Sequence, residues 1–153
     1  MRRRFKLKQM DSLQIKTVDY RNKIAAIAQI RTTVFQLEQG VSKELEFDGK
    51  DASAIHLLAY SDNKAVGTAR IREIDASTAK IERLAVLPEA RKQGIGKKLM
   101  ETALKVISEQ NKSSVIVHAQ EYIASLYQQL GFVIVGERFN EAGITHVKMV
   151  KQL

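Results

Sequence analysis

The spacing of hydrophobic residues along the chain follows two periods, and each predicts a different kind of element. Apolar and polar residues alternate over 13–16, which is typical of a half-buried strand, whereas apolar residues between 24 and 35 recur at helical spacing after Asp19, a residue suited to cap a helix. Over the whole chain the pattern predicts strands at 11–18, 55–60, 65–73, 80–86, 114–118, 132–139 and 144–150. It predicts helices at 19–36, 96–110 and 122–130, with an acidic loop or broken helix at 38–51.

The order of these elements is that of an α+β protein. Four strands precede the helix at 96–110, whose inward stripe we expect to comprise Leu99, Met100, Ala103, Leu104 and Ile107. The chain has 153 residues, enough to bury a single hydrophobic core, and no repeat or linker divides it. We therefore expect one domain at 13–153, preceded by a basic and flexible N-terminal arm at 1–12.

The composition excludes several classes of site. The chain has no cysteine, which rules out disulfide bridges, thiolate metal ligands and a cysteine nucleophile. Its three histidines, His56, His118 and His146, are widely spaced and lack ligand-spaced partners, so we expect no metal site. No apolar run approaches the roughly 20 residues of a membrane-spanning helix, and we expect a cytoplasmic protein without membrane contact.

The net charge of +8 is concentrated in two places. Five cations lie in the first ten residues, and 89–98 carries a net charge of +3. A nucleic-acid-binding protein usually spreads its cations along a groove and interleaves aromatic residues, but only 6% of this chain is aromatic. The pattern therefore does not favour a nucleic acid as partner, although binding through the arm at 1–12 stays open as an alternative.

The stretch with the most specific chemistry follows the predicted strand at 80–86. Pro88 ends that strand, and Arg-Lys-Gln-Gly-Ile-Gly at 91–96 opens the next helix. Two glycines separated by one residue let the backbone approach a bulky anion, and a helix N-terminus offers free N–H groups. Neither a Walker P-loop nor the dinucleotide fingerprint is matched, because Arg91 and Leu99 stand where those motifs need glycine. The residues favour a pyrophosphate site, with a simple turn of the chain as the alternative.

This stretch and its flanks resemble the GNAT superfamily of N-acetyltransferases. Residues 91–96 fit the family's acetyl-CoA signature [RQ]-x-x-G-x-[GA], and Ile-Glu-Arg-Leu-Ala-Val-Leu-Pro at 81–88 looks like its bulged fourth strand. Ala-Ser-Leu-Tyr-Gln-Gln-Leu-Gly-Phe at 124–132 is similar to the helix that carries the family's catalytic tyrosine. The resemblance covers about 13–153 and points to small bacterial members of the family. It implies a mixed, mostly antiparallel, twisted sheet of six to seven strands flanked by about four helices.

The resemblance also implies acetyl-CoA as cosubstrate and a small amine or peptide as acceptor, which attacks the thioester directly in a ternary complex. A homodimer stays open. Many family members have an asparagine where this chain has Glu121, so Gln120 is expected to contact the cofactor instead. The cofactor-binding residues implied are Leu84, Ala85, Val86, Leu87, Arg91, Lys92, Gln93, Gly94, Ile95, Gly96, Lys97, Lys98 and Gln120.

Three side chains are candidates for the chemistry itself. Tyr127 is implied as the acid that protonates the leaving thiolate, and the alternative is a tyrosine packed in the core. Glu82 is the first candidate for the general base, with a cross-strand salt bridge to Arg70 or Arg72 as the alternative. His118 is the second candidate, because the ordinary pKa of a histidine suits the task.

The acidic segment at 38–51 bears on the acceptor. It carries a local charge of −3 from Glu38, Glu44, Glu46, Asp48 and Asp51 against two lysines. In the GNAT fold this connection forms one wall of the acceptor cleft, so we expect it to attract an amine with a further positive charge, unless it is only a solvated loop. A non-catalytic acyl-CoA-binding sensor on the same fold is the alternative to an enzyme.

Overall fold

The structure, a computed structural model, describes residues 13–153, so the basic arm predicted at 1–12 lies outside the described residues. The strands are β1 (Leu13–Val18), β2 (Ile55–Ser61), β3 (Lys64–Glu73), β4 (Thr78–Val86), β5 (Ser114–Gln120), β6 (Val133–Glu141) and β7 (Ile144–Gln152). The helical segments are α2 (Tyr20–Arg31), η1 (Thr32–Glu38), α3 (Lys43–Glu46), η2 (Pro88–Ala90), α4 (Ile95–Ser108), η3 (Glu121–Ile123) and α5 (Ala124–Gln129).

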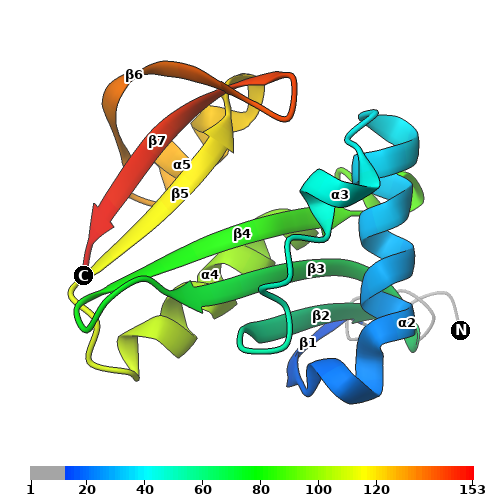
Figure 1. Ribbon diagram of the computed structural model, residues 1–153. Helices are drawn as coiled ribbons and strands as arrows, with labels where there is room; N and C mark the ends of the chain where they lie inside the picture. Colours follow the sequence, from blue (N-terminus) through cyan, green and yellow to red (C-terminus); the bar gives the residue numbers. More distant parts are fainter. Residues whose placement is uncertain (1–12) are drawn as a thin grey trace, which may run out of the picture.

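The seven strands form one sheet in the order β1-β2-β3-β4-β5-β7-β6. Every neighbouring pair is antiparallel except β4 and β5, which run parallel. These two strands pair only over Thr78–Lys80 and Ser114–Ile116. Beyond that point they diverge, so that the sheet is split at one end (Figure 1). The predicted mixed, mostly antiparallel sheet is confirmed.

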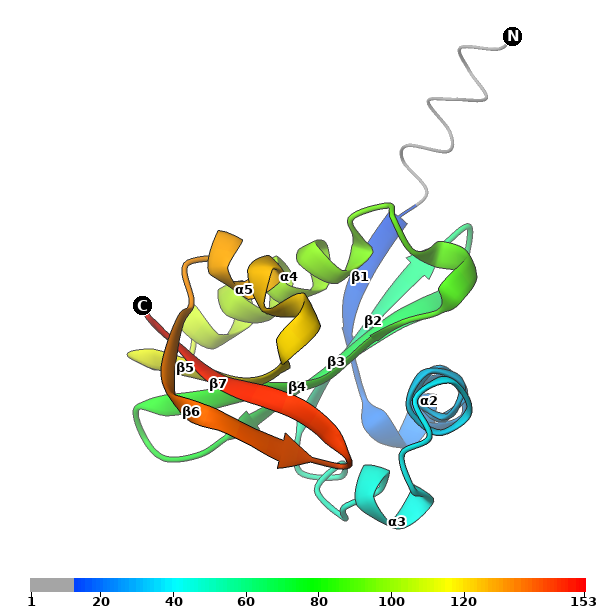
Figure 2. The same cartoon turned by 90° about the horizontal axis from the view of Figure 1, so that it is seen from above.

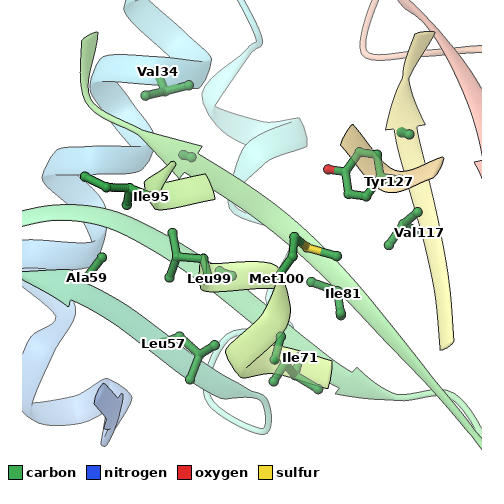
Figure 3. Close-up of a cluster of buried hydrophobic side chains, with 14 of the residues drawn as sticks. Val34, Leu57, Ala59, Ile71, Ile81, Ile95, Leu99, Met100, Val117 and Tyr127 are labelled. Carbon is green, nitrogen blue, oxygen red and sulfur yellow. The ribbon is translucent and has the colours of Figure 1, made fainter. Parts of the chain in front are cut away.

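Helices cover both faces of the sheet. Figure 2 shows α4 and α5 on one face and α2 and α3 on the other. The stripe predicted for α4 is buried at Leu99, Met100, Ala103 and Ile107, while Leu104 is only half buried. Together with apolar side chains of the central strands, these residues form the core (Figure 3). Within residues 13–153, no helix is long and apolar enough to cross a membrane.

The first predicted helix differs from expectation near its end. Asp19 caps α2 as predicted, since its side chain accepts a hydrogen bond from the backbone N–H of Arg21 at 3.1 Å. The α-helix ends at Arg31, however, and the chain continues as the π-helical segment η1. Such wider turns often occur at functional sites. The acidic stretch that follows contains the short helix α3, so the expected broken helix is confirmed.

A β-bulge interrupts β4 beside the split in the sheet. Between the pairs Thr68–Ala85 and Arg70–Glu82, β4 has two residues where β3 has one. One of the two, Arg83, has a φ of 57°, which is strained for a residue with a side chain. Its guanidinium donates hydrogen bonds of 3.2 and 3.3 Å to backbone carbonyl oxygens of α3. Contacts with α3 therefore hold the bulge in place, and the bulge redirects the end of β4.

Candidate active site

A cleft of about 820 Å³ occupies the space between the diverging ends of β4 and β5. This volume lies within the roughly 300–1,000 Å³ that is typical of ligand sites. Its walls come from η1 and α3 on one side, the edge of β4 and the loop before α4 at one end, and α5 with the β6–β7 turn on the other side. The split in the sheet thus brings segments that are far apart in the sequence to one site.

The loop that leads into α4 has the geometry of an anion site. Lys92 and Gly94 both have positive φ angles, of 64° and 76°, and such alternation turns backbone N–H groups toward one point. Gly94 occupies the N-cap position of α4, where no side chain caps the helix. The first N–H groups of α4 therefore lack intrahelical partners. A Cβ added at Gly94 would meet no atom of residues 13–153 within 4 Å, so these residues leave the space beside Gly94 open.

Most of the residues expected to bind the cofactor line this cleft. They are Leu84, Ala85, Val86, Arg91, Lys92, Gly94, Ile95, Gly96, Lys97 and Gln120. Leu87, Gln93 and Lys98 are not among the lining residues. Leu87 is buried in the core, and Lys98 lies beside β1 near Leu13 and Ile15, because the helical period turns it away from Lys97.

The end of β4 presents backbone groups to the cleft. The N–H of Leu87 donates to the carbonyl oxygen of Val66 at 2.8 Å, on the side of β3. Backbone polar groups alternate in direction from one residue to the next along a strand. The N–H and C=O groups of Val86 therefore face the edge that β5 leaves uncovered. The carbonyl oxygen of Val86 accordingly accepts a hydrogen bond from Arg91 Nε at 3.0 Å instead of a sheet partner. The N–H of Val86 points to the same side.

The end of η1 bridges the cleft in two places. Glu38 accepts a hydrogen bond from Arg91 Nη1 at 2.5 Å, and this bond lowers the pKa of Glu38. The next residue, Gln39, accepts one from Gln120 Nε2 at 2.9 Å. The charge of Arg91 is thus partly neutralised within the protein, whereas Lys92 and Lys97 are exposed.

Tyr127 is both a core residue and a cleft residue. Its ring is buried and meets Phe132 edge-on, with 6.0 Å between ring centroids, as expected for core packing. It also lines the cleft, and Figure 3 shows its hydroxyl oxygen pointing away from Val117. Burial, helped by nearby Tyr122, raises the pKa of Tyr127 above its ordinary value. The phenol is therefore protonated at neutral pH.

His118 lies across the cleft in contact with two charged groups. Its Nδ1 is 3.1 Å from Glu141 Oε1 and 3.3 Å from Lys80 Nζ. One ring nitrogen cannot donate to a carboxylate and accept from an ammonium at once, so the two contacts correspond to different tautomers of His118. His146 lies 3.6 Å from the other oxygen of Glu141.

The sequence interpretation did not identify Glu141, which it assigned only to a turn. The turn at 142–143 joins β6 to β7, and the pairing of β7 with β5 brings His146 opposite Gln120. The signal was therefore present in the order of strands. A carboxylate at the end of a hairpin that folds back on the strand of His118 is a candidate partner for that histidine.

Glu82 is surrounded by cations. Its carboxylate accepts hydrogen bonds of 3.0 and 2.6 Å from Arg70 and another from Arg72, and Lys80 Nζ lies 3.4 Å away. Burial alone would raise the pKa of Glu82, but Arg72, Arg70 and Lys80 outweigh it and hold the pKa at about 2. The predicted cross-strand salt bridge is confirmed, with both of the arginines named.

The acidic segment does line the cleft, but most of its carboxylates are paired with arginines. Glu46 is buried in an ion pair with Arg31, and Asp51 pairs with Arg31 at 2.6 Å and with Arg70 at 3.0 Å. Asp48 accepts hydrogen bonds of 2.8 and 2.9 Å from Arg70. The bonds from Arg70 lower the pKa of Asp48, and the two arginines outweigh burial to lower that of Asp51.

The arginines that pair with these carboxylates lie on other elements. The net charge of the segment alone therefore did not predict its charge in the folded protein. Within the acidic segment, Glu44 alone has no ion-pair partner among residues 13–153. Arg31 occupies a position of the buried stripe of α2 that also contains Ile27 and Ile30. A charged residue in an apolar stripe was the available signal that a buried carboxylate must exist elsewhere.

Proteins of related sequence align with most of this chain. A family profile for the acetyltransferase (GNAT) domain matches residues 17–153. A Bacillus subtilis protein named as an acetyltransferase is 37% identical over 143 residues, covering 92% of this chain and 97% of its own length. The uncharacterised N-acetyltransferase YjcF of the same organism is 33% identical over 80% of this chain and 87% of its own.

Solved structures share the fold. An acyl-CoA N-acyltransferase from Pseudomonas aeruginosa superimposes with a TM-score of 0.82 at 29% identity, covering 92% of this chain and 99% of that one. A GNAT family acetyltransferase from Elizabethkingia anophelis, solved with acetyl-CoA bound, gives a TM-score of 0.73 at 21% identity over 94% of this chain and 99% of that one. The chain belongs to the GNAT acetyltransferase family.

Proposed function

We propose that this protein transfers an acetyl group from acetyl-CoA to a primary amine, by direct attack of the amine while both substrates are bound. The observation that carries the proposal is the parting of β4 and β5. It leaves the bulged edge of β4 open between the uncapped N-terminus of α4 and the side chains of Tyr127 and His118. Binding of acetyl-CoA by the Elizabethkingia anophelis neighbour supports the choice of cosubstrate.

The groups around the cleft fit acetyl-CoA. The unpaired N–H groups of the first turn of α4 suit a pyrophosphate, and exposed Lys92 and Lys97 add positive charge. The absence of a Cβ at Gly94 keeps the approach open. The uncovered edge of β4 suits the amides of the pantetheine arm. The N–H of Val86 is the donor we assign to the oxyanion that develops on the thioester carbonyl.

Of the two candidate bases, the surroundings favour His118. Glu82 is already bonded to cations, and a carboxylate with a pKa of about 2 is a poor proton acceptor at neutral pH. We assign the proton of His118 to Nδ1, which lies 3.1 Å from Glu141, so that Nε2 is the acceptor. We assign His118 the proton of the attacking amine, Glu141 the positioning of the imidazole, and Glu82 the anchoring of the surrounding cations.

Tyr127 completes the step on the sulfur side. As the amine nitrogen bonds to the carbonyl carbon, the carbon–sulfur bond breaks, and the phenol of Tyr127 gives its proton to the departing thiolate. His118 holds the proton lost by the amine, and exchange with solvent restores both side chains. Because its pKa is raised, Tyr127 carries the required proton when the reaction begins.

The test is release of the CoA thiol in the presence of a panel of amines, compared between wild type and Tyr127→Phe. We expect this substitution to lower kcat by about 10- to 1,000-fold while calorimetry shows an unchanged Kd for acetyl-CoA. Tyr60→Phe, a change on β2 outside the cleft, is the matched control and should leave kcat unaltered.

Two outcomes would contradict the proposal. If acetyl-CoA binds but no amine is acetylated, the protein is a sensor of acyl-CoA and not an enzyme. If Tyr127→Phe lowers the melting temperature sharply without changing kcat, the tyrosine acts only in the core beside Phe132.

A further inference from the structure

The charged side chains around Glu82 are not balanced. The ion pairs of the described residues join five cations and four carboxylates into one cluster on the α3 side of the sheet. The cations are Arg31, Arg70, Arg72, Lys80 and Arg83, and the carboxylates are Glu46, Asp48, Asp51 and Glu82. Counted by these direct ion pairs, the cluster has one more cation than carboxylates, and a further carboxylate, Glu141, contacts the same ring nitrogen of His118 as Lys80 does.

The surplus lies where the cluster meets the cleft. Arg31 and Arg70 are fully buried and fully paired, whereas the side chains of Arg72 and Lys80 are 21% and 15% exposed and line the cleft. Both side chains form their ion pair with Glu82, and Arg70 pairs with the same carboxylate. Arg72 uses only its Nε for that bond, and its two terminal nitrogens have no hydrogen-bond partner within 13–153.

Arg72 and Lys80 share a single carboxylate, that of Glu82, although they lie close together. Arg72 on β3 stands directly opposite Lys80 on β4 in the register of the two strands. Like charges at directly opposed positions destabilise a sheet. An anionic group bound between them would relieve this repulsion and take up the unused donors of the guanidinium.

We infer that Arg72 and Lys80 form a binding site for an anionic group of the acceptor, so that the acceptor is an amine bearing a carboxylate or a phosphate. The inference rests on the proposed acetyl transfer and names its substrate class. It reverses the expectation of a cationic acceptor, because three of the five carboxylates on which that expectation depended, Glu46, Asp48 and Asp51, are paired with Arg31 or Arg70.

The location of His118 fits this arrangement. Lys80 Nζ lies 3.3 Å from the His118 ring, which is the base assigned to the attacking amine. An acceptor whose anion contacts Lys80 and Arg72 therefore has its amine within a short distance of that ring. Amines with the anion only a few bonds away, such as α-amino acids or aminoalkyl phosphates, satisfy both contacts.

The test compares matched amines that differ only in the anion. Wild-type enzyme would be assayed by thiol release with glycine and other α-amino acids against their carboxamides, and with phosphoethanolamine against ethanolamine. We expect kcat/KM to be at least 10-fold higher for the anionic member of the preferred pair. The preferred pair also identifies the anion as carboxylate or phosphate.

Variants then assign the effect to the two cations. Arg72→Gln and Lys80→Gln should raise KM for the anionic amine by about 10- to 100-fold without changing Kd for acetyl-CoA, and the ratio of kcat/KM between the anionic amine and its uncharged counterpart should fall. Arg72→Lys should retain part of the affinity, because it keeps the charge but not the planar fork. Lys105→Gln, which removes an exposed cation of α4 outside the cleft, is the control.

Failure of the inference is distinguishable from failure of the proposed function. If uncharged or cationic amines are acetylated as well as anionic ones, the anion site is wrong and acetyl transfer stands. If no amine is acetylated, acetyl transfer is wrong.

Calorimetry on the CoA complex then tests the anion site independently of activity. It compares the binding of N-acetylglycine with that of N-acetylglycinamide, and of N-acetylated phosphoethanolamine with that of N-acetylethanolamine. Equal or absent binding of each anion and its neutral counterpart overturns the site.

Discussion

The two sides of the cleft handle charge in opposite ways. The loop before α4 and the first turn of that helix expose Lys92 and Lys97 to solvent beside unpaired backbone N–H groups. The opposite side buries its charges, since Arg31 and Arg70 are at most 1% exposed and contact several carboxylates. On one side the cations are exposed at the cleft, and on the other side most charged groups form ion pairs within the protein.

The difference shows when local charge in a sequence predicts a surface field. The loop keeps its predicted positive character because, among residues 13–153, most of its cations have no partner from a distant segment, with Arg91 and its bond to Glu38 as the exception. The acidic segment loses its predicted character because arginines of α2 and β3 fold onto it. Buried charges attract partners from anywhere in the chain, so their effect appears only with the tertiary structure.

The largest expected effect is on stability. Arg70→Met leaves Asp48, Asp51 and Glu82 without their shared partner in a buried setting, which should cost about 3–5 kcal/mol of unfolding free energy. Lys97→Met, which removes an exposed cation from the other side, should stay within about 0.5 kcal/mol. Urea denaturation of both variants measures the difference. Equal losses, large or small, would remove the contrast between the two sides.

The elements of the fold were largely predictable, because they depend on local periodicity. The run of β-forming residues at 114–118 predicts a strand and the helical stripe at 96–110 a helix, and β5 and α4 are found there. The π-helical turn of η1 was not predictable in this way. It shares the apolar spacing of an α-helix. At its end, Glu38 accepts a hydrogen bond from Arg91 and the next residue, Gln39, accepts one from Gln120.

The candidate site also has parts that the sequence predicts and parts that it does not. The anion loop is contiguous in sequence, so its glycine spacing and charge identify it directly. The pairing of His118 with Glu141 joins β5 to the end of β6, and that of Glu82 with Arg70 and Arg72 joins β4 to β3. Such contacts follow from strand order and register, which periodicity alone does not determine.

The next effect is on the pH dependence of stability. Because the pKa of Glu82 lies at about 2, below its ordinary value, Glu82 contributes stability that is complete above about pH 4.5 and is lost as the pH falls toward 2. The contribution is about 3 kcal/mol for this side chain, which is 10% exposed. Asp48 and Asp51, whose pKa values are also lowered, act in the same direction.

Glu82→Gln measures this contribution separately. Glutamine cannot balance the surrounding cations, so the variant should be less stable at pH 7, and its deficit relative to wild type should shrink as the carboxylate of wild type is protonated. Urea denaturation at pH 7, 5, 4 and 3 follows that difference. A deficit that stays constant over this range would mean that the ion pairs of Glu82 add nothing to stability.

The smallest effect concerns the exposed side and separates binding from stability. Gly94→Glu and Gly94→Gln introduce the same strain at a φ of 76°, where the added Cβ meets no other atom, and each should cost about 1 kcal/mol of stability. The glutamate also adds a negative charge at the N-terminus of α4, which stabilises a helix by a few tenths of a kcal/mol but repels an anionic ligand. We therefore expect Gly94→Glu to be slightly more stable than Gly94→Gln and yet to bind acetyl-CoA about 10-fold more weakly, with a gap in Kd that narrows as salt is added. Calorimetry and thermal unfolding of the two variants measure both quantities, and equal Kd values would show that the charge of this loop is not directed at the ligand.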